Sequence, residues 1–256
     1  MGINKIMNSP YFQLTLEISQ KTPSKLPYYG PLVRGWMGDA FYYHEDLMEK
    51  IFKNPDVDVR PYFHYTISNG NTHIVNILFI GYATRYVRKI VEALAEKHNS
   101  HIGGIPAVIK LIKYEERHFE LLASSEEIEI RFISPTTLLE YGKILYRPPS
   151  LELLLKAILR AVNRCCKYYF KAAYPIHIED TDSLKSKLMK FEISPFFWTH
   201  KTMDGRNLKM SGITGSVTYR MNEKPSDDIM KILTLPQVFQ IGKWVSYGFG
   251  KLEVST

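Results

Sequence analysis

The stretch Ile241-Gly-Lys-Trp-Val-Ser-Tyr-Gly-Phe-Gly-Lys-Leu-Glu-Val254 decides how the rest of the chain is interpreted. Gly248 and Gly250 flank Phe249, and a short run typical of a β-strand begins at Lys251. Glycine adopts positive φ angles and lets another backbone approach closely. A dinucleotide fingerprint runs from strand through glycine turn to helix, whereas here a helix precedes the glycines and a strand follows them. The stretch predicts either a tight turn into an edge strand or a place where another molecule comes near.

The residues before this stretch predict one unit in the order β-α-β-β-α-β. Ser226 is followed by Asp227 and Asp228, which is typical of a capped helix start because the helix dipole favours acids there. A turn at Asp204-Gly205 separates two strand-like runs. The expected elements are a strand at 128–133, a helix at 150–171, strands at 191–199 and 208–221, a helix from 226 to about 245 with a break at Pro236, and the terminal strand.

The first half of the chain predicts the same order. Asn69-Gly70-Asn71 is a strong hairpin signal, and Pro31 suits the first turn of a helix. The expected elements are a strand at 11–19, a helix at 32–52 with an interruption near His44, strands at 59–68 and 72–80, a helix at 84–97, a glycine loop at 99–104 and a strand at 105–114 with a partner at 118–122. Two such units predict an α+β protein with a tandem ferredoxin-like fold, divided into domains 1–125 and 126–256.

Composition favours an anionic partner. The 256 residues carry a net charge of +7, from 33 basic and 26 acidic side chains. Residues 1–125 hold 14 basic and 12 acidic side chains, and residues 126–256 hold 19 and 14, so most of the excess lies in the second half. The two cysteines, Cys165 and Cys166, are adjacent and offer neither a useful disulfide nor zinc spacing, which fits a reduced cytoplasmic setting. No signal peptide and no apolar run of membrane-spanning length is expected.

A basic stripe runs along the helix expected at 150–171. Its residues follow one another at spacings of four, four, three and four: Lys156, Arg160, Arg164, Lys167 and Lys171. Such residues lie on one face of a helix, and a face without acids is suited to binding phosphates. An ordinary solvated face, or one paired with acids elsewhere, is the alternative. A second basic group surrounds the predicted hairpin turn: His200, Lys201, Arg206 and Lys209.

These features together resemble the CRISPR-associated RAMP proteins, most closely their repeat-processing endoribonuclease, the sixth Cas family. The resemblance covers nearly the whole chain in the order of its elements. Its motifs are the terminal stretch, Gly212-Ile-Thr-Gly215-Ser-Val-Thr-Tyr219 and Pro31-Leu-Val-Arg34-Gly35-Trp-Met-Gly38. Within a second ferredoxin-like unit, Gly248 and Gly250 are expected to face RNA. Other RAMP subunits share the terminal motif, so it indicates the superfamily better than the activity.

The resemblance implies metal-independent cleavage of precursor CRISPR RNA within each repeat, without a cofactor. The ribose 2′-hydroxyl attacks the adjacent phosphate and leaves a cyclic phosphate and a free 5′-hydroxyl. Some members use a tyrosine, a histidine and a lysine around the first helix, and Tyr29, His44 and Lys50 match them. The resemblance assigns proton transfer to His44, an orienting or proton-transfer role to Tyr29, and phosphate stabilisation to Lys50. If the helix ran on through residue 44, His44 would instead be an ordinary core histidine.

Two alternatives stay open at the level of sequence. His200 is a second candidate for the catalytic histidine, because it lies beside Lys201 on a predicted surface hairpin. A non-catalytic RAMP subunit that binds CRISPR RNA in an effector complex would use the same glycines and basic face. The expected partners are CRISPR repeat RNA and, in addition, either other Cas subunits or a second copy of the chain, with no membrane.

Overall fold

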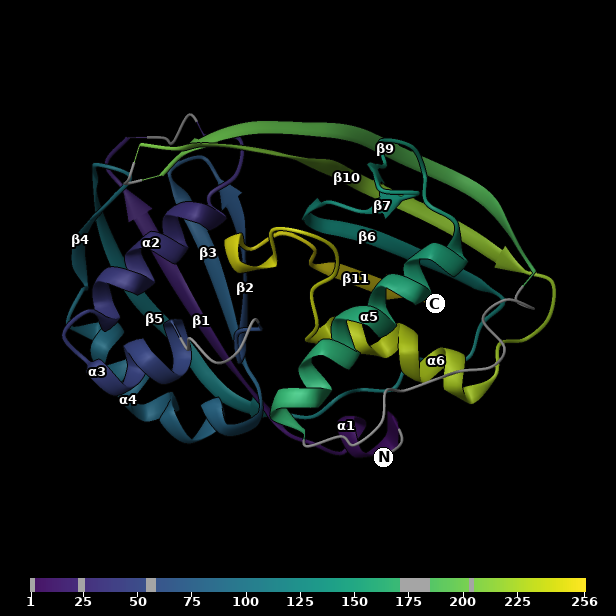
Figure 1. Ribbon diagram of the computed structural model, residues 1–256, viewed down its shortest axis with the longest axis horizontal. Helices are drawn as coiled ribbons and strands as arrows, with labels where there is room; N and C mark the ends of the chain where they lie inside the picture. Colours follow the sequence, from purple (N-terminus) through teal and green to yellow (C-terminus); the bar gives the residue numbers. More distant parts are fainter. Residues whose placement is uncertain (1–2, 23–25, 54–58, 171–184, 203–204) are drawn as a thin grey trace. The chain divides into compact units, whose positions relative to one another are not determined.

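The structure, a computed structural model, describes residues 3–22, 26–53, 59–170, 185–202 and 205–256 (Figure 1). Its backbone contacts divide the chain into two compact units, and each is described by itself. The N-terminal unit contains residues 10–117 and 246–248, and the C-terminal unit contains residues 1–9, 118–245 and 249–256.

The N-terminal unit is built on a five-stranded antiparallel sheet in the order β2-β3-β1-β5-β4. Two short helical turns, Met48–Phe52 and Gly81–Tyr86, accompany its main elements. Those elements are β1 (Tyr11–Gln20), α2 (Gly30–Phe41), α3 (Glu45–Leu47), β2 (Tyr62–Asn69), β3 (Thr72–Phe79), α4 (Val87–Ala95), β4 (Asn99–Ile102) and β5 (Ile105–Arg117).

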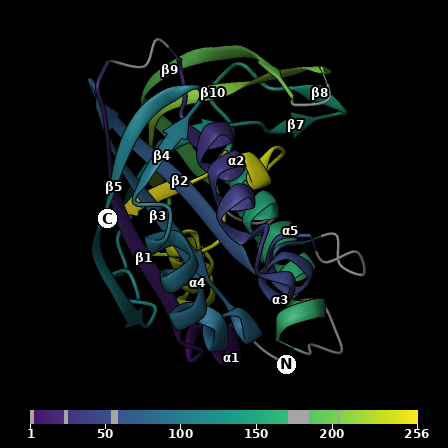
Figure 2. The same cartoon turned by 90° about the vertical axis from the view of Figure 1, so that its left-hand side faces the viewer.

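The core of this unit lies between the sheet and α2 with α4. Figure 2 shows α2 and α4 on the same side of the sheet. The alternating residues Leu14, Leu16 and Ile18 of β1 are buried against Trp36 of α2 and Ile90 of α4. Apolar residues at helical spacing in the helices and at a spacing of two in the strand therefore face one another, as the sequence predicts.

The C-terminal unit repeats the topology with a four-stranded antiparallel sheet in the order β11-β6-β10-β9. If the strands are counted along each unit without β4 and without the separate hairpin β7–β8, both sheets have the order 4-1-3-2 of a ferredoxin-like fold, and the predicted tandem fold is confirmed. The elements are α1 (Ile3–Met7), β6 (Glu127–Thr136), β7 (Leu139–Glu140), β8 (Lys143–Ile144), α5 (Leu151–Tyr169), β9 (Ser186–Lys201), β10 (Asn207–Met221), α6 (Asp227–Thr234) and β11 (Leu252–Ser255).

Helices α5 and α6 bury the apolar side of this second sheet. Leu154 and Ile158 of α5, Ile130 of β6 and Leu233 of α6 are fully buried. Each helix begins at a serine whose hydroxyl accepts a backbone hydrogen bond: Ser150 caps α5 and Ser226 caps α6. The predicted cap at Ser226 is thereby confirmed.

The structure corrects several local predictions. Residues 99–104 form β4 and a two-glycine turn rather than a loop, and β4 pairs with β5 in the place expected for 118–122. The strand β6 continues through Pro135 to Thr136. The last helix ends at Thr234, with a single 3-10 turn at Leu235–Gln237 after it, because proline removes a backbone donor. The hairpin β7–β8 and the short α1 were not expected.

None of the helices in the described ranges combines the length and the apolar character that crossing a bilayer requires. Cys165 and Cys166 are both buried free thiols on α5. Burial raises the pKa of the Cys166 thiol to about 11.

Gly250 joins the terminal stretch to the C-terminal sheet. Its amide donates to Pro135 O at 2.9 Å, and its carbonyl accepts from Ile241 N at 2.9 Å. Its φ is +87°, and a Cβ there would collide with the carbonyl oxygen of Ile241 and lie 2.8 Å from the Ile241 nitrogen. The neighbouring atoms are backbone and cannot move aside, so glycine is required here.

We therefore expect Gly250→Ala to destabilise the protein by about 2–4 kcal/mol, because backbone strain and overpacking act together. Gly142→Ala is the matched control. Gly142 has φ +79° in the turn of β7–β8, but nothing lies within 4 Å of its Cβ position, so only the cost of the left-handed conformation, about 1–2 kcal/mol, applies. Urea unfolding of the two variants measures the difference. Equal losses in both would show that close approach at Gly250 is unimportant.

Candidate functional site

His44 lies where the first long helix of the N-terminal unit breaks. Helix α2 ends at Phe41, and His44 has φ −115° and ψ 85°, which are not helical values, before α3 begins at Glu45. Its amide donates to Phe41 O at 2.9 Å, and its carbonyl accepts from Met48 N at 2.9 Å. The interruption expected near His44 is confirmed. The side chain is therefore not carried on an uninterrupted helix face into the core.

The imidazole of His44 is partly accessible and has an acidic neighbour. Its side chain is 21% exposed, and Nε2 lies 3.5 Å from Oε2 of Glu96, just after α4. Two further ion pairs join the segments that carry His44 and Glu96. Lys89 pairs with Asp46 at 2.7 Å, and Lys97 pairs with Asp39 at 2.8 Å. The surroundings of His44 thus hold charges of both signs. A carboxylate beside an imidazole can orient the ring.

Lys50 lies on the helical segment that begins at His44, fewer than two turns later. Its Nζ is 5.8 Å from the centroid of the Tyr86 ring. A hydrogen bond with Tyr86 raises the pKa of Lys50, and the side chain is exposed. A permanent cation therefore stands close in sequence to the histidine, where it can meet a phosphate.

Tyr29 does not lie with His44. It precedes α2, and His44 follows the same helix, whose 12 residues span about 18 Å. The Tyr29 ring is buried and stacks on His73 with centroids 3.8 Å apart. Burial raises the pKa of its hydroxyl, which has no hydrogen-bond partner among the described residues. The expected partnership of Tyr29 with His44 is not formed in this structure.

Two tyrosines beside His44 were not singled out from the sequence. Tyr42 is 67% exposed and Tyr43 is 80% exposed, and their rings meet edge to face with centroids 5.1 Å apart. Large aromatic side chains are usually buried, so an exposed pair at a helix break is unusual. The signal available in the sequence was their position at the predicted interruption.

The glycines of the terminal stretch face the protein interior. Gly248 and Gly250 are both buried. The carbonyl of Gly248 accepts a 2.6 Å hydrogen bond from the Tyr28 hydroxyl, and both backbone groups of Gly250 are bonded as described above. The Gly248 carbonyl and both backbone groups of Gly250 thus bond to protein partners, and a direct contact of these glycines with RNA stays a prediction. Between Ile241 and Leu252, only Lys243 is exposed.

Gly248 packs against a buried histidine. A Cβ on Gly248 would lie 2.7 Å from the Tyr28 hydroxyl and 3.2 Å from Nε2 of His64. His64 is fully buried, and its Nε2 donates to Gly30 O at 3.1 Å. Burial lowers the pKa of the imidazole to about 4. His64 is thus a neutral structural group that packs beside Gly248, rather than an acid or base for catalysis.

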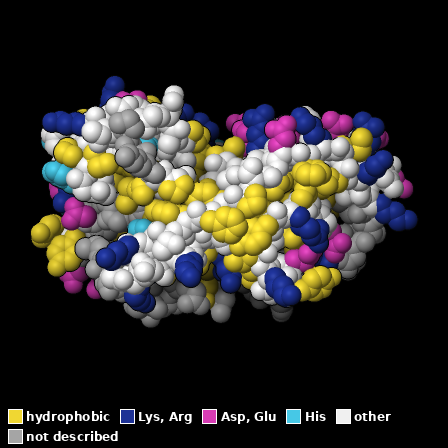
Figure 3. All heavy atoms as spheres, turned by 90° about the horizontal axis from the view of Figure 1, so that it is seen from above, with side chains coloured by type: hydrophobic (Ala, Val, Ile, Leu, Met, Phe, Trp, Pro, Cys, Tyr) yellow, Lys and Arg dark blue, Asp and Glu magenta, His cyan; other side chains and the backbone are white. Residues whose placement is uncertain are grey.

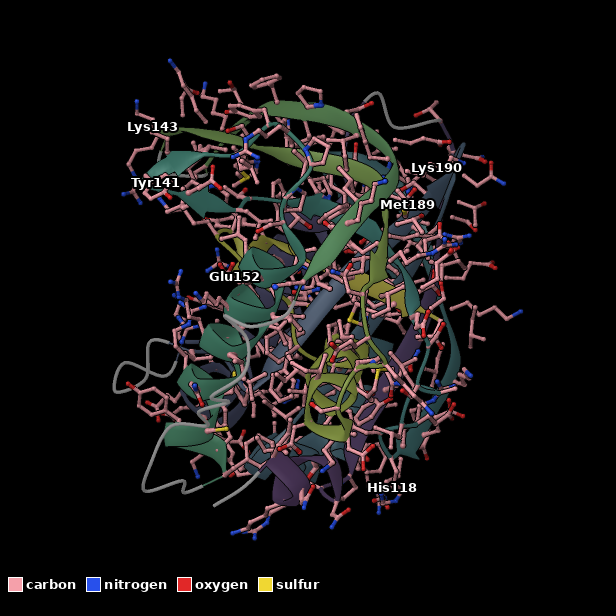
Figure 4. The ribbon with its side chains drawn as sticks, turned by 90° about the vertical axis from the view of Figure 1, so that its right-hand side faces the viewer. His118, Tyr141, Lys143, Glu152, Met189 and Lys190 are labelled. Atoms are coloured by element: carbon pink, nitrogen blue, oxygen red, sulfur yellow. The ribbon has the colours of Figure 1, made fainter. Side chains whose placement is uncertain are left out.

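Helix α5 carries the predicted basic stripe only in part. Arg160 and Arg164 are exposed and form no ion pair in the described part of the chain. Lys156 instead pairs with Glu152 at 2.6 Å, one turn earlier, so its charge is compensated within the helix. The Lys167 side chain and Lys171 lie outside the described residues. In Figure 4, Glu152 at the start of α5 and Tyr141 and Lys143 at the tip of β7–β8 lie along one side of the C-terminal unit.

The basic hairpin is formed by β9 and β10. His200 pairs with Leu208 across the ladder, and its ring lies 5.3 Å from that of Trp198. Lys201, Arg206 and Lys209 are exposed around the turn. Figure 3 shows hydrophobic side chains gathered over the outer side of these strands, with basic and acidic side chains beside them. His200 thus lies next to an aromatic ring and directly before Lys201, on a regular strand.

Part of the chain matches a protein-family model. Residues 130–252 match the family model described as the CRISPR-associated endoribonuclease Cas6. A sequence comparison with curated proteins found no match. The matched range begins in β6 and ends at the first residue of β11.

The whole chain is similar in fold to solved Cas6 structures. A Cas6 product complex has a TM-score of 0.62 at 17% identity and covers 95% of this chain and 98% of that chain. Cas6 from Thermus thermophilus has a TM-score of 0.61 at 15% identity, with 96% and 98% covered. A RAMP protein described as binding different RNA substrates has a TM-score of 0.56 at 14% identity, with 96% and 100% covered. The resemblance to repeat-processing RAMP proteins is confirmed.

The burial of His64 predicts a pH dependence of stability. Its pKa is about 4 in the folded protein and about 6.5 when unfolded. The unfolded chain therefore takes up a proton first, so stability is lost as pH falls from 6.5 towards 4, by at most about 3 kcal/mol. We expect His64→Gln to lose less stability than the wild type between pH 7 and pH 5 in urea unfolding. His101→Gln, at an exposed histidine, should behave like the wild type. A His64→Gln curve parallel to the wild type would contradict this role.

Proposed function

We propose that the protein is an endoribonuclease that cleaves precursor CRISPR RNA within its repeats, and the match of residues 130–252 to the Cas6 family model supports the proposal. The observation that carries the proposal is the placement of His44. It stands at a helix break, partly exposed, with a carboxylate at 3.5 Å and an exposed lysine less than two turns away. An ordinary core position for His44 would have required the helix to run on through residue 44, and α2 instead ends at Phe41.

The proposed reaction needs only proton transfers and charge stabilisation. The 2′-hydroxyl of the ribose before the cleavage point loses its proton to a base as its oxygen attacks the adjacent phosphorus. The bond from phosphorus to the 5′-oxygen of the next nucleotide breaks, and that oxygen takes a proton. The products are a 2′,3′-cyclic phosphate and a free 5′-hydroxyl. Imidazole suits such transfers because its ordinary pKa lies near neutrality.

In this proposal His44 is the proton-transfer group and Lys50 stabilises the charge on the phosphorane. Glu96 orients the imidazole through its contact at 3.5 Å. Lys50 keeps its charge at neutral pH, since contact with Tyr86 raises its pKa, and a fixed cation aimed at developing charge lowers the barrier. Tyr29 lies at the other end of α2, so its contribution is to the packing of that helix end rather than to proton transfer at His44.

The proposed substrate contacts include the tyrosine pair. Tyr42 and Tyr43 directly precede His44 and expose most of their ring surface. Unpaired RNA bases stack on exposed aromatic rings, and each stacked base contributes about 1–3 kcal/mol of binding free energy. A base held next to His44 would fix the adjoining phosphate within its reach.

Cleavage of the cognate repeat RNA in EDTA tests the function. His44→Ala should slow cleavage at saturating RNA by roughly 10²–10⁴-fold, the contribution of general acid–base catalysis, while the affinity for RNA stays unchanged. His101→Ala, an exposed histidine in the same unit, is the control and should cleave normally. A product that accepts a 5′-phosphate from a kinase, and resists phosphatase at its 3′ end, identifies the chemistry.

Two results would redirect the proposal. Loss of cleavage in His200→Ala, with normal cleavage in His44→Ala, would move the chemistry to the β9–β10 hairpin. Tight binding without cleavage of any cognate repeat would favour a non-catalytic RAMP subunit that holds CRISPR RNA.

A second measurement addresses the tyrosine pair. We expect Tyr42→Ala or Tyr43→Ala to weaken binding of unpaired repeat RNA about 5-fold to 150-fold, in proportion to the stacking energy lost. Tyr114→Ala, on β5 and 55% exposed, is the control and should leave the affinity unchanged. Fluorescence anisotropy with labelled RNA measures the effect. Equal affinities for all three variants would exclude a stacking role at residues 42 and 43.

A further inference from the structure

A pocket of about 460 Å³ lies beside α5 in the C-terminal unit. Its size falls within the range of about 300–1,000 Å³ that is typical of pockets for small organic groups. Three segments line it, namely the residues after β6, one side of α5, and the start of the terminal stretch: Thr137, Leu138, Leu139, Leu153, Ala157, Arg160, Ala161, Asn163, Arg164, Gly242 and Lys243.

The lining divides into an apolar floor and a cationic rim. Leu138 and Ala161 are buried at 2% and 5% exposure. Arg160, Arg164 and Lys243 are exposed. Most of the wall is therefore hydrocarbon, and the charged groups stand where the pocket opens to solvent.

The charge of the rim is not compensated. Among the described residues, none that lines the pocket is acidic. In the described ranges, neither the two arginines nor Lys243 forms an ion pair, in contrast to Lys156, which pairs with Glu152. Three cations without an acid beside an apolar hollow attract a ligand with an anionic group and an apolar body.

The pocket is held open by the backbone. The amide of Lys243 donates to Thr137 O at 3.1 Å, in an isolated bridge between the two segments. Gly242 has φ +82°, and a Cβ there would collide with the Thr137 carbonyl oxygen. Only glycine lets the terminal stretch pass so close to the residues after β6. The wall next to α5 is therefore preformed and needs no ordering when a ligand binds.

We propose that this pocket takes one unpaired nucleotide of the bound RNA. The base enters against the leucine and alanine side chains, and a guanidinium of Arg160 or Arg164 lies over its face. The phosphates on either side of that nucleotide contact the remaining rim cations, including Lys243. Proteins that read single-stranded RNA receive splayed-out bases in this way, on aromatic rings or on arginine planes. The inference rests on the proposed function, since it takes RNA as the ligand.

A pocket that binds a base and a helix face that binds only phosphates predict different effects of substitutions on RNA binding. Filling the pocket should weaken RNA binding without changing the number of phosphates that the protein neutralises. Removing a rim cation should change that number. For a single strand, each neutralised phosphate adds about 0.7 to the slope of log affinity against log salt concentration.

The test uses the full-length protein and a repeat RNA in which fluorescent 2-aminopurine replaces each unpaired base in turn. Ala157→Phe fills the pocket, and we expect roughly tenfold weaker binding, an unchanged salt slope and loss of the fluorescence change at one RNA position. Lys243→Ala should lower the salt slope by about 0.7, and so should alanine at one of Arg160 and Arg164, the arginine that contacts a phosphate rather than the base. Two controls should match the wild type: Leu159→Phe, which adds a ring on α5 outside the pocket lining, and Lys224→Ala, which removes an exposed cation elsewhere in the unit.

Thermal unfolding verifies that each variant is folded. If the phenylalanine variant is not, Ala157→Leu fills less of the pocket, keeps a good helix former and should give a smaller loss in the same direction. Wild-type affinity and fluorescence in a folded filled variant would overturn the pocket. RNA binding that depends on the pocket, without cleavage of any repeat, would overturn the proposed endoribonuclease activity and support the proposed pocket. A wild-type protein that binds no repeat RNA would overturn both.

Discussion

The C-terminal unit depends on backbone contacts that only glycine permits. Gly250 has positive φ against the backbone of Ile241, and two hydrogen bonds of 2.9 Å fix it there. These bonds set where β11 joins β6, and they bring Lys251 beneath the turn that follows α6. Its Nζ donates to Pro236 O at 2.6 Å and Gln237 O at 2.7 Å. Burial lowers the pKa of Lys251 to about 7, and the two carbonyls offset part of that cost. Gly242 likewise has positive φ and lies against the backbone of Thr137, and this contact shapes the pocket beside α5.

The topology could be predicted because its signals are local and agree with one another. Strand and helix periods, the hairpin at Gly70 and the cap at Ser226 each specify one element. The errors fall where local signals are absent. β4 is short and glycine follows it, so it reads as a loop, and only its pairing with β5 makes it a strand. The hairpin β7–β8 turns at Tyr141, which has φ +48°. Tyrosine seldom adopts that conformation, so Gly142, with φ +79°, is the one turn signal at this hairpin, and the strands of two residues on either side add none.

The candidate site could be predicted only where it depends on chain geometry near one residue. The helix break that frees His44 was expected, but the separation of Tyr29 from it was not, because spacing in sequence does not show which residues a helix holds apart. The burial of Gly248 depends on Tyr28, which lies 220 positions away in sequence. No local pattern reports such a contact. The exposure of Tyr42 and Tyr43 was missed for the opposite reason, since the general tendency of aromatics to be buried is wrong at this loop.

The electrostatic settings of the two proposed regions differ, and the difference suits different tasks. Around His44, Glu96 and the pairs Asp46–Lys89 and Asp39–Lys97 largely cancel one another, so this region adds little long-range attraction for RNA. Among the described residues, the pocket beside α5 is lined by cations and by no acid or histidine, so its lining attracts phosphates but does not transfer protons near neutral pH. Binding of RNA at the pocket can then position the RNA for cleavage. The barrier to cleavage is set by the groups around His44. Substitutions of the pocket cations should therefore act mainly on affinity, and substitutions of His44 mainly on rate, whereas Tyr42 and Tyr43 contribute to affinity next to His44.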